Sequence, residues 1–407
     1  MGNPIEGKHI LLGVTGSIAS YKAADLASRL AQAGAQVDVI LTQAATQFLT
    51  PLTFQSVTGR QAYIEKDLWG GEGHILHVGL GHAADLLIIA PASANTLAKL
   101  AHGLADNLLT VTALAARCPV LVAPAMDGGM FAHSATQDNI EILKRRGVIL
   151  LGPVTGHLAS GLQGIGRMME PTDLLGHIRL VLGQSGKFSG RRVVVTAGGT
   201  QEPIDPVRYI TNRSSGKQGF ALAQSALDMG ADVTLIAGNT CLSTPIGAYR
   251  VDVGSAQEML AAVLDALPGA DILLMSAAVA DFKPVHQSQQ KIKKQAGLPT
   301  IELALAVDIL DAVAVYKSQH GFPRLTVGFA AESQALLENA RVKLASKKLD
   351  LIVANDISAS DAGFAVDENR VTLLSTAGEA EPLPLMSKTQ VAEVVLERAA
   401  FLLGVDG

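Results

Sequence analysis

A loop in the second half of the chain has the residue types and spacing of an anion-binding site. A β-branched run, Val193–Val195, predicts a buried strand before the loop, and we expect a helix to begin near Ser215 after it. Backbone N–H groups at the start of a helix have no partner within the helix and bind anions. Charged and polar side chains crowd the loop: Asp205, Arg208, Asn212, Arg213, Ser214, Ser215 and Lys217. The alternative is an ordinary solvated surface loop.

Two groups of lysines later in the chain could bind a polyphosphate. In a strand running from Lys291 to Lys294, alternate side chains would share a face, so Lys291 and Lys293 would point the same way. A helix further on carries Lys343 and Lys347 on one face. The alternative for both groups is a solvated, lysine-rich surface.

The first half begins with a strand, His9–Val14, followed by Gly16 and Ser17 and then by a helix. The first turn of such a β-α-β unit is the usual place for a phosphate group. The glycines lack the GxGxxG spacing of nicotinamide-dependent dehydrogenases, so that class is disfavoured. Alternatively, Gly16 and Ser17 only turn the chain and cap the helix.

Another strand of this half, Asp85–Ala90, ends just before Ser93, Asn95 and Thr96. Open α/β sheets bind ligands at the carboxyl ends of their strands. These three side chains are therefore candidates for ligand binding, unless Asn95 and Thr96 only cap the following helix.

Three segments of the second half repeat the pattern of three segments of the first. Residues 193–195, 230–237 and 271–278 echo residues 9–12, 34–41 and 85–92. We therefore predict an α/β protein with two doubly wound, Rossmann-like domains. Residues 183–190 are the best linker, which places the domains at 1–189 and 190–407. Val371–Leu374 is predicted to be an antiparallel edge strand.

The composition favours a globular, cytoplasmic protein. Of the 407 residues, 48% are hydrophobic and 17% are charged, which is enough to bury large cores. The net charge of −5 gives no basic field for nucleic acid. We expect no membrane span and no signal peptide, and the two cysteines form no disulfide framework.

Together these motifs resemble those of the bacterial bifunctional phosphopantothenoylcysteine decarboxylase / phosphopantothenate–cysteine ligase family, over essentially the whole chain. The segments that carry the resemblance are TGSIASYK (15–22), IAPASANTLAKLAHGLADNLL (89–109), DPVRYITNRSSGKQGF (205–220), AAVADF (277–282), KIKK (291–294) and GFAAE (328–332). The resemblance implies an N-terminal flavoprotein domain that binds FMN and a C-terminal nucleotide-binding ligase domain. It implies a role in coenzyme A biosynthesis. CTP would activate 4′-phosphopantothenate as an acyl-cytidylate, L-cysteine would displace CMP, and FMN-dependent decarboxylation would then give 4′-phosphopantetheine.

In the flavoprotein domain, the resemblance assigns FMN binding to Gly16, Ser17, Thr42, Ser93, Asn95 and Thr96. His77 matches the family's catalytic histidine. Two partners differ from the family pattern. Asp127 stands where an asparagine would bind the substrate carboxylate, and Ser160 stands where a cysteine would donate a proton. The alternative function is an active ligase whose degenerate flavoprotein domain is kept for assembly.

In the ligase domain, the resemblance assigns catalysis to Arg208, Asn212 and Lys291. Arg208 would hold the activated acid, Asn212 would bind the acyl-cytidylate region, and Lys291 would face the nucleotide phosphates. The CTP-binding positions are Met275, Ser276, Ala277, Asp281, Lys291, Val307, Asp308, Ile309, Leu310, Phe329, Lys343 and Lys347. Mg²⁺ would neutralise the triphosphate, through ligands that the sequence does not identify. The resemblance also implies a homo-oligomer, a dodecamer built from trimers and dimers.

Overall fold

The chain forms two compact units, which we describe separately. The structure, a computed structural model, describes residues 2–69, 73–159, 161, 163–293, 300–332, 335–356, 368–376, 378 and 380–405. The units are Asn3–Leu182 and Gly183–Gly407, the second of which also includes Gly2. The domain boundary predicted from the sequence, between residues 189 and 190, lies a few residues later because residues 183–190 are interpreted as a linker. Phe188, however, is fully buried, and its N–H donates to the carbonyl of Met229, so this segment is part of the second unit.

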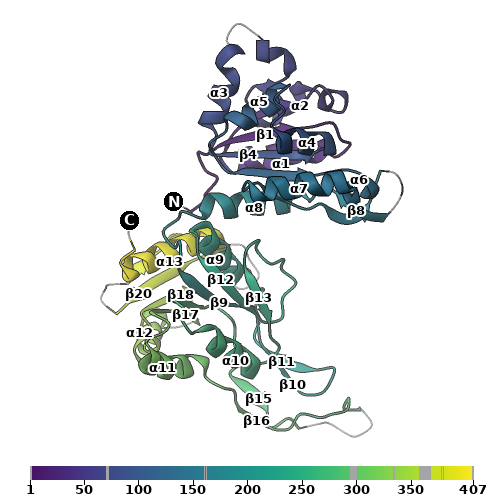
Figure 1. The fold of residues 1–407 in the computed structure, drawn as a ribbon. Helices are drawn as coiled ribbons and strands as arrows, with labels where there is room; N and C mark the ends of the chain where they lie inside the picture. Colours follow the sequence, from purple (N-terminus) through teal and green to yellow (C-terminus); the bar gives the residue numbers. More distant parts are fainter. Residues whose placement is uncertain are drawn as a thin grey trace. The chain divides into compact units, whose positions relative to one another are not determined.

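The N-terminal unit is built on a parallel sheet with helices on both faces (Figure 1). Its six strands lie in the order β3-β2-β1-β4-β5-β6. They are β1 (His9–Val14), β2 (Gln36–Leu41), β3 (Ala62–Tyr63), β4 (Leu86–Ala92), β5 (Val120–Pro124) and β6 (Ile149–Leu150). The helices are α1 (Ser20–Gln32), α2 (Pro51–Thr58), α3 (Gly73–Ala83), α4 (Ala94–His102), α5 (Leu108–Ala115), α6 (Gly128–Ala132), α7 (Ser134–Arg145) and α8 (Pro171–Gly183). A hairpin of β7 (Val154–His157) and β8 (Gln163–Arg167) precedes α8.

Alternating side chains of each central strand feed two different cores, because successive strand residues point to opposite faces. In β1, Ile10 and Leu12 join a core with α1, α2 and α8. Leu11 joins the opposite core with α4, α5 and α7. The sheet is thus buried on both sides, as its continuous apolar strands predict.

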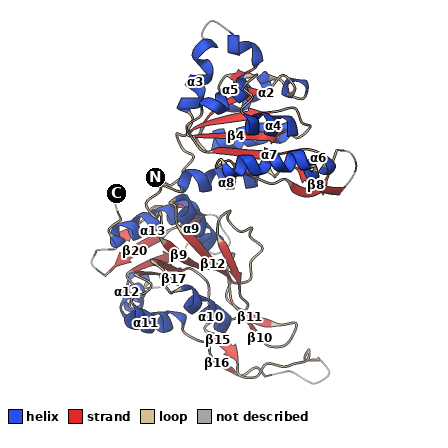
Figure 2. Ribbon diagram, in the orientation of Figure 1, coloured by secondary structure: helices blue, strands red, loops and turns tan. Residues whose placement is uncertain are grey.

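The C-terminal unit repeats this plan with a longer sheet (Figure 2). Its eight strands lie in the order β13-β12-β9-β14-β17-β18-β20-β21. They are β9 (Arg192–Ala197), β12 (Asp232–Ala237), β13 (Tyr249–Asp252), β14 (Ile272–Met275), β17 (Leu325–Glu332), β18 (Leu351–Asp356), β20 (Val371–Ser375) and β21 (Glu381–Pro382). The helices are α9 (Lys217–Asp228), α10 (Ala256–Ala266), α11 (Ile309–His320), α12 (Leu336–Ser346) and α13 (Lys388–Leu403).

The two sheets place equivalent strands in equivalent positions. Strands β9, β12 and β14, which echo β1, β2 and β4 in sequence, occupy the same places in the strand order. The strand order reverses between β1 and β4 in the first sheet and between β9 and β14 in the second. Doubly wound sheets bind ligands in the crevice at this point of reversal. The predicted fold class, two doubly wound α/β units, is confirmed.

Two local predictions are wrong. Strand β20 pairs antiparallel with β18 as expected, but β21 pairs along its other side, so β20 is not the edge. The segment from Lys291 to Lys293 is not a strand, and Lys294 lies outside the described residues. The strands on either side of this segment, β15 (Phe282–Pro284) and β16 (Leu303–Leu305), pair with each other.

Two small ribbons extend the C-terminal unit beyond its sheet. The β15–β16 ribbon lies beside a second one formed by β10 (Gln201–Pro203) and β11 (Tyr209–Thr211), at the lower end of Figure 1. A third pairing joins β19 (Glu368–Asn369) to β22 (Met386–Ser387), directly before α13. Within the part of the chain that the structure describes, no helix is long and apolar enough to cross a lipid bilayer.

Candidate functional site

The turn between β1 and α1 is built to receive an anion. Thr15 is buried, and its Oγ1 donates to the carbonyl of Pro91 (2.8 Å) and accepts from the N–H of Ser93 (3.0 Å), which joins the β1 and β4 ends. Helix α1 starts without a side-chain cap and has no acidic residue in its first turn. A Cβ on Gly16 would lie 2.6 Å from the Cβ of Ala44. The positive end of the α1 dipole and the closely packed backbone of the turn fit the phosphate of a flavin nucleotide.

The other predicted flavin-binding residues line adjacent strand ends, and some of them also hold the loops. Ser93 caps α4 by accepting from the N–H of Thr96 (3.3 Å), and Thr42 Oγ1 accepts from the N–H of Ala45 (3.3 Å). Asn95 is exposed and is not the cap. The simple capping role therefore falls to Ser93, while Asn95 remains available to a ligand.

Asp127 lies at the carboxyl end of β5 and caps the short helix α6. Its Oδ1 accepts from the N–H of Gly129 over 2.9 Å. The preceding residue, Met126, contacts the β7–β8 hairpin, because its N–H donates to the carbonyl of Gly166 (3.0 Å). Ser160, which lies between β7 and β8 in the sequence, is outside the described residues.

His77 lies on α3, half-buried. Its neighbours Leu76 and Leu80 pack into the core beneath the helix. Among the described residues, Nδ1 of His77 is buried and has no hydrogen-bond partner. A buried polar atom of this kind normally has a partner, so it fits a site completed by a ligand.

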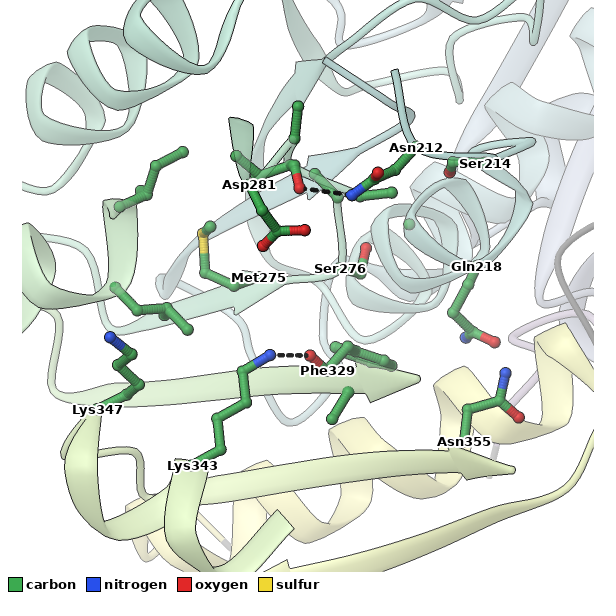
Figure 3. A pocket seen from close by; sticks show the side chains of 18 of the residues that line it. Asn212, Ser214, Gln218, Met275, Ser276, Asp281, Phe329, Lys343, Lys347 and Asn355 are labelled. Atoms are coloured by element: carbon green, nitrogen blue, oxygen red, sulfur yellow. Dashed lines mark hydrogen bonds between the residues drawn. The ribbon is translucent and has the colours of Figure 1, made fainter. Parts of the chain in front are cut away.

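A large cavity opens over the carboxyl ends of the C-terminal strands (Figure 3). Its volume is about 1210 Å³. Every predicted CTP-binding residue except Lys291 lines it: Met275, Ser276, Ala277, Asp281, Val307, Asp308, Ile309, Leu310, Phe329, Lys343 and Lys347. The loop from Asn212 to Gly219 lines it as well, so the α9 N-terminus faces the same space. The fold thus brings together residues from segments that lie far apart in the sequence.

Polar contacts fix several side chains of this cavity. Asn212 donates from Nδ2 to the carbonyl of Val279 (2.9 Å), and Lys343 donates to the carbonyl of Phe329 (3.1 Å), both drawn in Figure 3. Lys347 forms ion pairs with Asp308 (2.7 Å) and Asp311 (2.9 Å). The amide of Asn212 is thereby oriented with its oxygen left to accept from a substrate.

The Lys347–Asp308 pair shifts the pKa of both groups. Burial alone would raise the pKa of Asp308, but hydrogen bonds from Lys347 and from the N–H of Asp311 outweigh it, and the pKa lies below its ordinary value. The hydrogen bond to Asp308 raises the pKa of Lys347. Both groups are therefore charged at neutral pH.

Arg208 and Lys291 lie apart from this cavity lining. Arg208 donates to the buried carboxylate of Asp205 (2.8 Å) and to the carbonyl of Ile292 (3.3 Å). Asp205 also accepts from the N–H of Ile292 (3.2 Å), so Arg208 and Lys291 are brought into one neighbourhood. Neither is among the cavity-lining residues, and their catalytic roles stay predictions.

Sequence reasoning missed a polar chain at one end of the cavity. Gln218 donates to the carbonyl of Lys388 (3.1 Å) and accepts from Nδ2 of Asn369 (3.1 Å). Gln218 and Asn355 point toward the same space in Figure 3. Asn355 lies at the carboxyl end of β18, and the sequence does contain the signal of a polar residue at the end of a predicted strand. Asn369 and Lys388 gave no such signal, because only the β19–β22 pairing brings them to the cavity.

Comparisons with known proteins extend over the whole chain. Residues 2–183 match the family model described as Flavoprotein, and residues 188–402 match the DNA/pantothenate metabolism flavoprotein C-terminal domain. One solved structure, the C-terminal domain of the coenzyme A biosynthesis bifunctional protein CoaBC, is 38% identical with a TM-score of 0.47, covering 55% of this chain and all of that one.

Full-length relatives cover the chain nearly from end to end. The coenzyme A biosynthesis bifunctional protein CoaBC of Bacillus subtilis is 44% identical over 401 residues, which is 98% of each chain. Its namesake in Mycobacterium tuberculosis is 44% identical over 410 residues, which is 98% of this chain and 97% of that one. This chain therefore belongs to the family of bifunctional coenzyme A biosynthesis proteins, in which a flavoprotein domain precedes a DNA/pantothenate metabolism flavoprotein C-terminal domain.

Proposed function

We propose that this protein carries out two successive steps of coenzyme A biosynthesis: CTP-dependent ligation of 4′-phosphopantothenate to L-cysteine, then decarboxylation of the product to 4′-phosphopantetheine. The observation that carries the ligase assignment is the single cavity lined by all the predicted nucleotide-binding residues except Lys291. Membership of the bifunctional family supports both steps.

In the ligation step, a carboxylate oxygen of 4′-phosphopantothenate attacks the α-phosphorus of CTP, and pyrophosphate leaves. The amine of cysteine then attacks the acyl carbon, CMP leaves with the bonding electron pair, and the amine loses a proton. Lys343, Lys347 and the N–H groups at the start of α9 supply positive charge to the phosphates. Asn212 orients the acyl-cytidylate, and Arg208 and Lys291 approach it from the ribbons. Mg²⁺ binds mainly through the triphosphate, as this ion commonly does.

In the decarboxylation step, this chain supplies binding and orientation. FMN, when bound, supplies the electron acceptor that allows the cysteinyl carboxylate to be lost. FMN would be held by the Gly16–Ser17 turn and by Thr42, Ser93, Asn95 and Thr96. His77 acts as the base near the thiol or the carboxylate, Asp127 lies beside the substrate carboxylate, and Ser160 returns a proton at the end.

The test is the product mixture that the purified protein forms from CTP, L-cysteine and 4′-phosphopantothenate, followed by mass spectrometry. We expect CMP, pyrophosphate, carbon dioxide and 4′-phosphopantetheine. Absence of CMP would refute the ligase assignment. Accumulation of phosphopantothenoylcysteine without carbon dioxide would instead favour an active ligase with a degenerate flavoprotein domain.

We also propose that the protein acts in the cytoplasm as a homo-oligomer, a dodecamer made from trimers of the flavoprotein domain and dimers of the ligase domain. This proposal rests on family membership. Light scattering of the purified full chain measures the mass directly, and a monomer would contradict it.

A further inference from the structure

Lys22 is a buried cation that none of the roles above uses. Its side chain is 5% exposed. Its ammonium group donates to the carbonyl of Met168 (3.0 Å) and to the carboxylate of Glu170 (2.9 Å). A buried ammonium group is costly unless acceptors surround it, so Lys22 holds these two acceptors in place.

Lys22 is fixed at one end to the turn that we assign to the flavin phosphate. It lies in the first turn of α1, two residues after the buried Ser20. The hydroxyl of Ser20 donates to the carbonyl of Ser17 (2.6 Å) and contacts the carbonyl of Thr15 (3.3 Å). The start of α1 therefore moves with the phosphate-binding turn.

At the other end, the acceptors of Lys22 lie directly after β8, the strand that contacts the Asp127 segment. Gly166 of β8 accepts from the N–H of Met126. A Cβ on Gly166 would lie 2.2 Å from the carbonyl oxygen of Met126, and its φ of +143° also favours glycine. The backbones are thus in direct contact, and a shift of β8 would shift Met126 and Asp127.

We propose that Lys22 is a positioning residue of the decarboxylase site: through Met168 and Glu170 it sets the distance between the flavin-phosphate turn and the segment that carries Asp127. The inference rests on the proposed decarboxylase function. Substrate would bind between these two parts, because its thiol must meet the flavin while its carboxylate meets Asp127. An error of about 1 Å in such a distance can cost about a hundredfold in rate.

A second cation beside Glu170 allows the contact from Lys22 to be removed by itself. Arg167 also pairs with Glu170 (2.6 Å), so the carboxylate keeps a partner when Lys22 is removed. The hydrogen bond from Lys22 is the largest cause of a lowered pKa at Glu170, which keeps this carboxylate ionised at neutral pH. Removing the Lys22 ammonium therefore breaks the link from α1 to β8 and leaves the Arg167–Glu170 pair.

The test compares full-length Lys22→Met with Arg29→Met. Arg29 lies on the same helix, in an exposed pair with Asp25, and is the matched control. The measurements are flavin content, the kcat and KM of decarboxylation, CTP-dependent CMP release, and hydrogen exchange of the backbone at residues 125–128 and 163–170. Glu170→Gln, which keeps an acceptor for Lys22, is the conservative variant.

We expect Lys22→Met to bind FMN and to release CMP as the unmodified protein does. Its kcat/KM for decarboxylation should fall by about tenfold or more, with faster exchange in both segments. Glu170→Gln should fall less, and Arg29→Met should not change.

Unchanged decarboxylation by Lys22→Met, or unchanged exchange in both segments, would overturn the inference. So would a joint loss of flavin and of protection over the whole flavoprotein unit, because that marks a residue that only stabilises the fold. If the unmodified protein itself released no carbon dioxide, the proposed decarboxylase function would fail, while the exchange comparison would still decide whether Lys22 links the two segments.

Discussion

Lys347 donates a 2.7 Å hydrogen bond to Asp308, and both residues line the cavity proposed to bind the nucleotide. Asp308 also caps α11, and Lys347 directly follows α12, so the pair joins the ends of two helices. A cation is thereby held at the cavity before any nucleotide binds. Preorganised charge of this kind stabilises phosphate transfer without reorganisation during the reaction.

Replacing Lys347 should weaken CTP binding. We expect Lys347→Met to raise the KM for CTP by about tenfold, since a charge-assisted contact to phosphate is lost. The adjacent Lys348→Met is the matched control, because Lys348 is exposed and does not line the cavity. Steady-state CMP release checks both, and equal KM values would contradict the role of Lys347.

The same pair should make stability depend on pH at both extremes. The pKa of Asp308 is lowered, so its contribution is present above the unfolded value of about 4 and is lost as the pH falls through the folded value. The pKa of Lys347 is raised, so its contribution is complete below about 10 and is lost as the pH rises through the folded value. The difference in melting temperature between the unmodified protein and Lys347→Met should therefore be largest between these limits. A difference independent of pH would rule out the ion pair as its source. Because Asp308 is half exposed, the pair should be worth no more than about 1 kcal/mol.

Substitutions of Asp205 and Arg208 should have different effects, the first on local structure and the second on ligation. The buried carboxylate of Asp205 accepts from the N–H groups of Val207, Arg208 and Ile292. Asp205→Asn keeps one acceptor oxygen but places amide hydrogens where the other oxygen accepts, so backbone exchange should accelerate either at Val207 and Arg208 or at Ile292. Arg208→Met leaves the three contacts in place and should mainly slow ligation. The opposite pattern, normal ligation by Arg208→Met, would remove Arg208 from the site.

Lys291 and Lys293 offer a pair of substitutions that differ by two positions. Both are exposed in the structure, and neither lines the cavity. If Lys291 reaches the nucleotide phosphates during the reaction, Lys291→Met should lower the kcat of ligation by about a hundredfold. Lys293→Met should leave it unchanged. Single-turnover CMP release measures this step, and equal rates for the two variants would refute the assignment.

Asp127 should limit substrate binding through its charge. Asn also caps helices well, so Asp127→Asn keeps the contact to Gly129 while it removes repulsion of the substrate carboxylate. We expect the KM of decarboxylation to fall by up to about tenfold. Asp127→Ala, which loses the cap as well, should not show this gain. A higher KM for Asp127→Asn would mean that the carboxylate is needed.

Much of the architecture could be predicted because the signals are local. Apolar runs followed by small residues mark the carboxyl end of each strand. The similarity of Val193–Val195 to β1 predicts that the two sheets have the same strand order around these strands. The residues that line the cavity at those ends are assigned by the resemblance to a known family. The resemblance to a known family supplied the choice of nucleotide, which physical reasoning from the residues did not.

The rest depends on contacts between distant segments. Asn369 and Lys388 reach the cavity through two-residue strands, which are too short to leave a periodic pattern. The edge assignment of β20 failed for the same reason, because β21 has only two residues. Lysine alternation at Lys291–Lys293 indicated a strand, but a single apolar side chain, Ile292, gives this segment little to bury.

The division of the chain into two units also affects how it folds during synthesis. Each half completes its own sheet from consecutive sequence, and the break falls at Leu182 and Gly183. All strands of the first sheet have therefore left the ribosome before synthesis of the second sheet has advanced far. Because domains generally fold as units during synthesis, we expect the equivalent strands β1 and β9 not to compete for the same partners, so that the order of translation disfavours mispairing between the two similar sheets.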